Sequence, residues 1–269
     1  MPSTTLPSGR PVEYDRSGEG PPVLLIPGLG DRRAAWAATA GDLAREFSPI
    51  SYDLRGYSGD EAGVFTIGDL AADSAGLIES LIREPAFVIG HSEGGFIALE
   101  LALVRPDLVR GLIVVSSASY TDEYGRKLLA HWREVAEGMG GAALAREMFL
   151  WGFSPNYFNS RAREVRLLQS LAADRETPLD AYLAHNHACT TYDVRGRLPS
   201  LAVPTLLLGG TADIVMTLRH NQILLRLIRG SRLVTFEGVG HHLCAEAPEE
   251  ASEVFVDFLR TQSQMVGGR

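Results

Sequence analysis

A serine lies between two glycines in the segment G-H-S-E-G at residues 90–94, directly after an apolar run. A serine hydroxyl is a weak nucleophile. It attacks a carbonyl efficiently only when a histidine removes its proton and a carboxylate orients that histidine. The G-x-S-x-G spacing is short enough to occur by chance, so the segment alone permits either a plain turn or a nucleophile at Ser92. The rest of the chain must decide between these interpretations.

Candidates for the histidine and the carboxylate come later in the chain, each after an apolar run. Residues 203–208 are followed by G-G-T-A-D, which ends at Asp213. Residues 233–236 are followed by E-G-V-G-H-H, which ends at His241 and His242. The order serine, aspartate, histidine is that of enzymes whose nucleophile lies on a sharp turn from a strand into a helix.

The pattern of the chain predicts such a turn, because short apolar runs alternate with amphipathic stretches as in a parallel sheet covered by helices. Strands are expected at Val23–Ile26, Ile50–Tyr52, Phe87–Ile89, Leu112–Val115, Val203–Leu208 and Leu233–Phe236. Helices are expected near residues 32–46, from Thr66 as N-cap to residue 82, at 94–104, at 217–229 and from Pro248. Ser92 therefore falls between a strand and a helix.

The alternation stops between Ser119 and about Pro199. This stretch is richer in aromatic and arginine residues and predicts a helical cap (119–199) over a core formed by residues 1–118 and 200–269. Its aromatic side chains are equally compatible with a cap core and with a substrate pocket. The candidates for substrate contact are Trp132, Phe149, Trp151 and Phe153.

Composition restricts the class of protein. The chain has 269 residues and a net charge of −8, which argues against nucleic acid or an anionic membrane as its partner. No apolar run approaches the roughly 20 residues that span a bilayer, and the N-terminus lacks the pattern of a signal peptide. The two cysteines, Cys189 and Cys244, do not make a disulfide framework. These features favour a cytoplasmic protein.

Five ordered motifs carry a resemblance to a known family: P-G-L-G, D-L-R-G-Y-S-G, G-H-S-E-G-G, P-T-L-L-L-G-G-T-A-D and G-H-H-L-C-A-E-A-P. Together they resemble the capped, esterase- and enol-lactonase-like members of the α/β-hydrolase fold. The resemblance implies a mostly parallel sheet flanked by helices, with a helical cap inserted after the sixth strand. It also implies a catalytic triad of Ser92, Asp213 and His241, with oxyanion-stabilising backbone amides at Leu29 and Glu93.

The rivals of these residues are assigned lesser roles. The family pattern G-H-x-x-x-x-E-x-P aligns with His241, Glu246 and Pro248, which leaves His242 as a packed neighbour. Asp193, in the segment returning from the cap, is expected to start a helix or form a salt bridge. His91 is expected to support the site. No complete metal-ligand set accompanies His185, His187 and Cys189 in the sequence. These residues are therefore expected on the cap surface or the pocket wall.

Two positions depart from the family pattern. Pro27 stands where many relatives carry histidine. The oxyanion donor of this loop is a backbone amide, so the change of side chain leaves the donor in place. Glu93 follows the nucleophile where relatives often have an apolar residue. A carboxylate facing the pocket would oppose the developing oxyanion, so the Glu93 side chain is expected to point away.

The resulting expectation is a serine hydrolase that cleaves a small ester or lactone through an acyl-enzyme, without cofactor or metal, as a monomer or homodimer. Two alternatives stay open. One is a C–C bond hydrolase or cofactor-free perhydrolase that uses the same triad. The other is a receptor-like member that binds a ligand and turns it over slowly.

Overall fold

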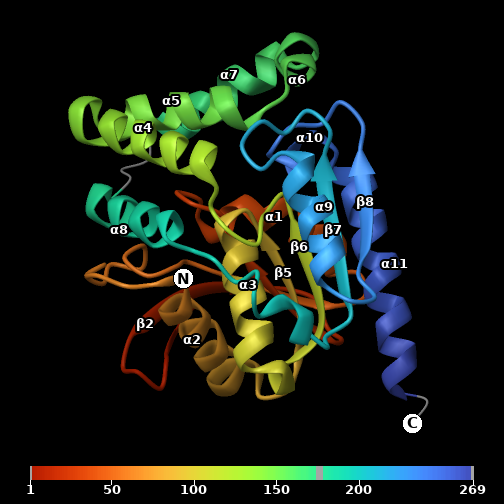
Figure 1. Ribbon diagram of the computed structural model, residues 1–269. Helices are drawn as coiled ribbons and strands as arrows, with labels where there is room; N and C mark the ends of the chain where they lie inside the picture. The colour runs from red at the N-terminus through yellow and green to blue at the C-terminus, as the bar shows by residue number, and fades with distance from the viewer. Residues whose placement is uncertain (1, 174–177, 268–269) are drawn as a thin grey trace.

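Eight strands form one sheet in the computed structural model, which describes residues 2–173 and 178–267 (Figure 1). The strand order is β1-β2-β4-β3-β5-β6-β7-β8. β1 and β2 pair antiparallel, as do β2 and β4, and all other pairs are parallel. The bounds are β1 Ser3–Thr5, β2 Pro11–Arg16, β3 Pro22–Ile26, β4 Ser48–Tyr52, β5 Ala86–His91, β6 Val109–Val115, β7 Thr205–Gly210 and β8 Arg232–Phe236.

The expected mostly parallel sheet is confirmed, and β3 to β8 fall on the six predicted apolar runs. The two antiparallel strands β1 and β2 were not predicted. Their side chains are largely exposed or half-buried, so neither strand carries the continuous apolar run of a central strand.

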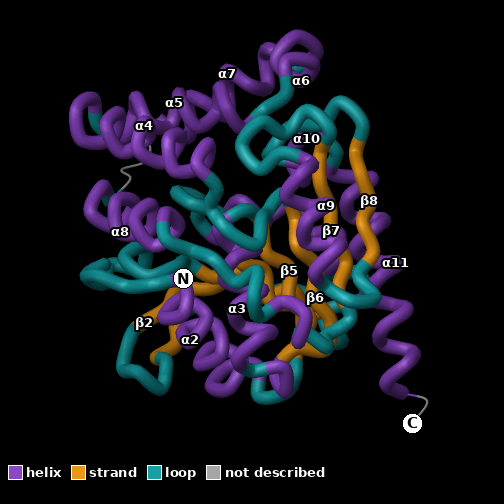
Figure 2. Tube along the Cα trace, viewed as in Figure 1, coloured by secondary structure: helices purple, strands orange, loops and turns teal. Residues whose placement is uncertain are grey.

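Helices cover both faces of the sheet (Figure 2). Leu24 and Ile26 of β3 belong to the buried cluster that includes residues of α2, α3 and α9, whereas the alternate residues Val23 and Leu25 belong to a second cluster that includes residues of α1 and α11. Outside the insertion described below, the helical segments are η1 Arg33–Trp36, α1 Ala37–Leu43, α2 Ile67–Leu77, η2 Ile78–Ile82, α3 Glu93–Val104, η3 Pro106–Leu108, η4 Leu198–Ser200, α9 Leu218–Leu227, α10 Leu243–Glu246 and α11 Pro248–Gly267.

Two of these helices behave as the sequence predicts. Thr66 caps α2 through a capping box, in which its hydroxyl accepts from the Asp69 amide and the Asp69 carboxylate accepts from the Thr66 amide. α3 is buried almost all round and packs against α2, β5 and β6. The helix that follows Ser92 is therefore one of the most constrained elements of the fold.

Between β6 and β7 the chain forms a helical insertion, as expected, and Figure 1 shows the helices of residues 123–173 above one end of the sheet and the helix of residues 179–190 below them. The apolar side of α4, including Leu128 and Trp132, joins the same buried cluster as α2 and α3, so the insertion packs firmly onto the sheet domain. No helix within the described ranges is long and apolar enough to cross a membrane. The insertion contains α4 Glu123–Met139, α5 Gly141–Gly152, α6 Pro155–Ser160, α7 Ala162–Ala173 and α8 Leu179–Thr190.

Candidate active site

Ser92 occupies the turn between β5 and α3 in an unusual backbone conformation. Its φ is 55° and its ψ is −115°, a region that costs a non-glycine residue about 1–3 kcal/mol. The surrounding structure holds this strain, because the Ser92 amide donates to the Val115 carbonyl at 3.0 Å and the Ser117 hydroxyl donates to the Ser92 carbonyl at 2.7 Å. The turn therefore presents the Ser92 side chain at the carboxyl end of β5.

The glycines on either side of Ser92 are required by close packing. A Cβ at Gly90 would lie 2.1 Å from the Gly94 carbonyl oxygen, and a Cβ at Gly94 would lie 2.2 Å from the Ile26 carbonyl oxygen. Both neighbours are backbone atoms and cannot swing aside. The G-x-S-x-G spacing is thus the spacing that allows β5, α3 and the end of β3 to meet.

A continuous chain of hydrogen bonds runs from Ser92 to a carboxylate. His241 Nε2 lies 3.0 Å from Ser92 Oγ, and His241 Nδ1 lies 2.9 Å from Asp213 Oδ2. The other Asp213 oxygen accepts from the backbone amides of Val215 and Met216, both at 2.8 Å. Because a carboxylate can only accept, His241 Nδ1 carries a proton toward Asp213. In the neutral ring, Nε2 is then free to accept the Ser92 hydroxyl proton.

The rival residues lie elsewhere. Asp193 pairs with Arg195 at 2.6 Å in an exposed position, and that hydrogen-bonded partner lowers the pKa of the Asp193 carboxyl. The ring of His242 lies 4.8 Å from the ring of Phe153. The structure therefore brings His241 and Asp213 to Ser92, whereas Asp193 and His242 occupy the kinds of position expected from the sequence.

Glu246 connects the histidine loop to the helical insertion. Its carboxylate accepts from the Gly240 amide at 3.1 Å, from the Ser154 amide at 2.8 Å and from the Ser154 hydroxyl at 2.6 Å. The sequence analysis used Glu246 only as a marker of spacing. Its fixed distance from His241 was the available signal of this role, but the Ser154 partner, 92 residues away, could not be identified from the sequence.

The two backbone amides expected to stabilise an oxyanion lie beside Ser92. Glu93 is the first residue of α3, where helix geometry leaves the N–H without an acceptor inside the helix. Leu29 lies on the loop after β3, and that loop comes so close that a Cβ at Gly28 would lie 3.3 Å from the Ser92 Cβ. Leu29, Ser92 and Glu93 also line one cavity together.

Two neighbouring cavities open around these residues. The inner cavity, of about 50 Å³, contains Ser92 and is walled mainly by apolar side chains, including Phe96, Leu128 and Trp132. The outer cavity, of about 250 Å³, is lined by aromatic and polar side chains, including Asp31, Arg32, His91, Phe149, Phe153 and His242. Three of the four candidate aromatics thus line a cavity. The fourth, Trp151, lines neither of these two cavities and donates from Nε1 to Glu147 at 3.1 Å.

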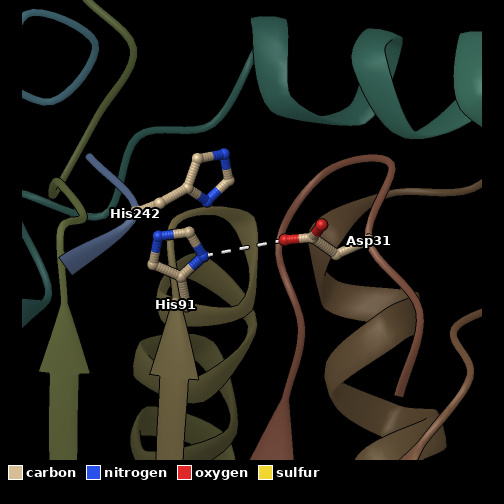
Figure 3. Close-up of side chains that lie close together, drawn as sticks. All are labelled: Asp31, His91 and His242. Carbon is tan, nitrogen blue, oxygen red and sulfur yellow. Dashed lines mark ion pairs between the residues drawn. The ribbon is translucent and has the colours of Figure 1, made fainter. Parts of the chain in front are cut away.

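Asp31, His91 and His242 converge at the junction of the two cavities (Figure 3). His91 Nε2 lies 3.0 Å from the His241 carbonyl oxygen, which can only accept, so Nε2 carries the proton. His91 Nδ1 then presents a lone pair 3.9 Å from Asp31 Oδ2. Burial, together with the neighbouring His241, lowers the pKa of His91 to about 3, and burial lowers the pKa of His242 well below its usual value.

Among the described residues, these three side chains are the group best placed to hold a metal ion, since two neutral imidazoles and a carboxylate suit zinc. One donor atom from each lies within 4.8 Å of the others. A tetrahedral zinc site brings its donors to about 3.4 Å from one another, given metal–nitrogen bonds of about 2.0–2.1 Å. The side chains would have to move together to bind an ion, so the present geometry does not define a metal centre.

The histidines and cysteine of α8 do not converge on one point. His187 is exposed, His185 is fully buried, and Cys189 lines the inner cavity. Burial, with the Glu93 carboxyl nearby, raises the pKa of Cys189 well above its usual value and keeps the thiol protonated. The Glu93 carboxyl, which was expected to point away from the pocket, is hydrogen-bonded to His185 of the insertion at 2.7 Å.

Comparison with known proteins places the chain in a family. The family model described as "Alpha/beta hydrolase family" matches residues 23–254, and the chain belongs to this family. The elbow at Ser92, the hydrogen bond to His241 and the sheet with its insertion after β6 agree with that membership. The resemblance expected from the sequence is confirmed.

The relatives and structural neighbours carry the names of different hydrolases. The chain is 27% identical to "Putative carbamate hydrolase RutD" of Azorhizobium caulinodans, over 91% of this chain and 93% of that protein. The enol-lactonase of Burkholderia xenovorans superimposes with a TM-score of 0.88 at 25% identity, covering 96% of this chain and 100% of the enzyme. A thermophilic esterase from Thermogutta terrifontis gives a TM-score of 0.87 at 25% identity, covering 97% and 99%.

Proposed function

We propose that this hydrolase cleaves a small carboxylic ester or lactone through an acyl-enzyme on Ser92, with His241 as the base and Asp213 as the orienting carboxylate. The observation that carries the proposal is the hydrogen-bonded chain Ser92–His241–Asp213, with contacts of 3.0 and 2.9 Å, buried beside a cavity. A serine, a base within reach and a third group that orients the base are the requirements for an activated nucleophile.

In the first half of the reaction, Ser92 Oγ attacks the carbonyl carbon while His241 Nε2 takes the hydroxyl proton. Asp213 stabilises the imidazolium that forms, and the amides of Leu29 and Glu93 donate to the oxyanion. The imidazolium then protonates the leaving alkoxide. From an ester this alcohol departs, whereas from a lactone it stays attached to the acyl group. A water molecule, deprotonated by His241, releases the acid from Ser92.

The dimensions of the cavities suggest which part of the substrate lies where. The inner cavity is small and apolar, which suits a short acyl group, and the outer cavity is larger and more polar, which suits the alcohol portion. We assign substrate selection to the insertion, taken as residues 119–199 over a core of residues 1–118 and 200–269. It contributes Trp132 to the inner cavity and Phe149 and Phe153 to the outer one.

Carbamate hydrolysis is the second candidate, favoured by the similarity to RutD over nine-tenths of both chains. A carbamate presents the same carbonyl carbon to Ser92 but carries nitrogen in place of the acyl carbon. The proposed triad and amides could therefore act on either substrate class.

The test compares wild-type protein with Ser92→Ala on p-nitrophenyl esters of increasing acyl length, on five- and six-membered lactones and on simple carbamates. Turnover should fall by at least about 10³-fold from wild type to Ser92→Ala, with an unchanged melting temperature, because the Ser92 hydroxyl is the nucleophile that His241 activates. Unchanged turnover in pure, folded Ser92→Ala would refute the proposal. The relative kcat/KM values of the wild type across the three substrate classes decide between the two candidates.

A further inference from the structure

The side chain that follows the nucleophile is joined to the helical insertion by a buried contact. Glu93 Oε1 lies 2.7 Å from His185 Nδ1, and the two side chains are 1% and 0% exposed. The other ring nitrogen, His185 Nε2, lies 2.9 Å from the Arg55 carbonyl oxygen. The His185 ring is stacked on Tyr57 at 5.2 Å and meets the edge of Phe65 at 4.7 Å. The position of the ring is thus fixed from several sides.

The hydrogen bonds determine how many protons this pair holds. The Arg55 carbonyl can only accept, so His185 Nε2 carries a proton. A contact of 2.7 Å between Nδ1 and Oε1 then requires one more proton between them, because two lone pairs would repel at that distance. Whether that proton is bound to nitrogen or to oxygen, the pair has a net charge of zero.

The phenols and the thiol beside the carboxyl group do not supply this neutrality. Glu93 Oε2 is buried, and among the described residues the carboxyl group contacts His185 through Oε1 and lies within hydrogen-bonding reach of the Cys189 thiol. Tyr57, Tyr182 and Cys189 lie near Glu93, and burial raises the pKa of each, so all three are uncharged near neutral pH. Neutral phenols and thiols cannot balance a carboxylate.

We infer that His185 is a positioning residue that neutralises Glu93, so that the backbone amide of Glu93 can stabilise an oxyanion. The inference rests on the proposed function, in which that amide receives the developing negative charge. The Glu93 carboxyl is only a few bonds from its own amide, and an unbalanced carboxylate there would repel the oxyanion in a water-poor site. His185 belongs to α8, so a residue of the helical insertion balances the charge of the carboxyl group that follows Ser92.

The test measures how fast Ser92 is labelled by a fluorophosphonate, which needs the nucleophile and the oxyanion donors but no knowledge of the substrate. In His185→Gln, the maximal labelling rate should fall by about 10- to 100-fold, the effect of one unbalanced charge at close range. The apparent binding constant of the probe should change by less than about threefold, because the repulsion arises only as the oxyanion forms. His187→Gln, an exposed change on the same helix, is the matched control and should label like wild type.

The decisive variant is Glu93→Gln/His185→Gln, which removes both partners and leaves two neutral amides. It should regain most of the rate lost in His185→Gln. A purely structural role for His185 predicts the opposite, namely that the double variant labels as slowly as the single variant or more slowly, and this result would overturn the inference. Equal labelling of wild type and His185→Gln would also overturn it. Failure of wild type to label would instead refute the proposed function, and with it this inference.

A measurement on wild-type protein keeps the inference testable if His185→Gln does not fold. Proton and ¹⁵N NMR of the histidine rings at pH 7.5 should show a proton on His185 Nε2 and a second, strongly deshielded proton between Nδ1 and Oε1. If no such proton lies between Nδ1 and Oε1, on either atom, Glu93 is an unbalanced carboxylate and the inference is wrong.

Discussion

Replacing His91 by glutamine should make the protein more resistant to acid than the wild type. The folded structure buries His91 against the backbone of His241, and burial lowers the pKa of His91 to about 3. In the unfolded chain, a histidine titrates near its ordinary pKa of about 6.5. The unfolded state therefore takes up this proton first. The stability that His91 contributes as a neutral ring is present above about pH 6.5 and is lost as the pH falls toward about 3.

The size of this loss of stability follows from the uptake of one proton by each unfolded molecule. Each pH unit below about 6.5 removes up to about 1.4 kcal/mol from the free energy of unfolding, so two units remove about 3 kcal/mol by pH 4.5. Glutamine cannot titrate, and its amide can still donate to the His241 carbonyl. Between pH 7.5 and pH 4.5, the wild type should therefore lose about 3 kcal/mol more stability than His91→Gln.

Urea unfolding followed by tryptophan fluorescence at both pH values measures this difference. Other titrating groups act in both proteins and cancel in the comparison, although part of the His242 effect will be included because the two rings lie 5.6 Å apart. His187→Gln, which changes an exposed ring, should follow the wild type. The same pH dependence in wild type and His91→Gln would show that burial against the His241 backbone does not hold His91 neutral.

Three further outcomes follow from the same structure. Gly94→Ala should lower the free energy of unfolding by more than about 3 kcal/mol in urea titrations, since its Cβ meets backbone, whereas Gly138→Ala, whose Cβ meets nothing within 4 Å, should not destabilise. Asp213→Asn should reduce kcat by about 10⁴-fold through the wrong histidine tautomer, and Asp193→Asn should retain it; the reverse ranking in steady-state assays would move the acid to the other loop. Trp132→Ala should raise kcat/KM for long acyl esters relative to acetate, and an unchanged ratio would exclude Trp132 from the acyl pocket.

The sequence by itself determined the framework of the site. Apolar runs of strand length mark β3 to β8, because buried parallel strands have no exposed face to interrupt them. The glycines around Ser92 mark positions where two backbone segments lie so close together that no side chain would fit between them. Parallel strands also bring the loops after their carboxyl ends to one edge of the sheet. The order of serine, aspartate and histidine along the chain therefore predicted that such residues meet at this edge, and the family pattern selected His241 over His242.

Only the tertiary structure decided which side chains touch. The sequence could not pair Glu93 with His185, since 92 residues and the whole path of the insertion separate them. It could not join Glu246 to Ser154, or separate Trp132, which lines the inner cavity, from Trp151, which does not. The physical reason is that periodicity and turn chemistry act over a few residues, whereas the partner of a buried polar group depends on how distant helices dock. That docking is determined by the packing of the whole core.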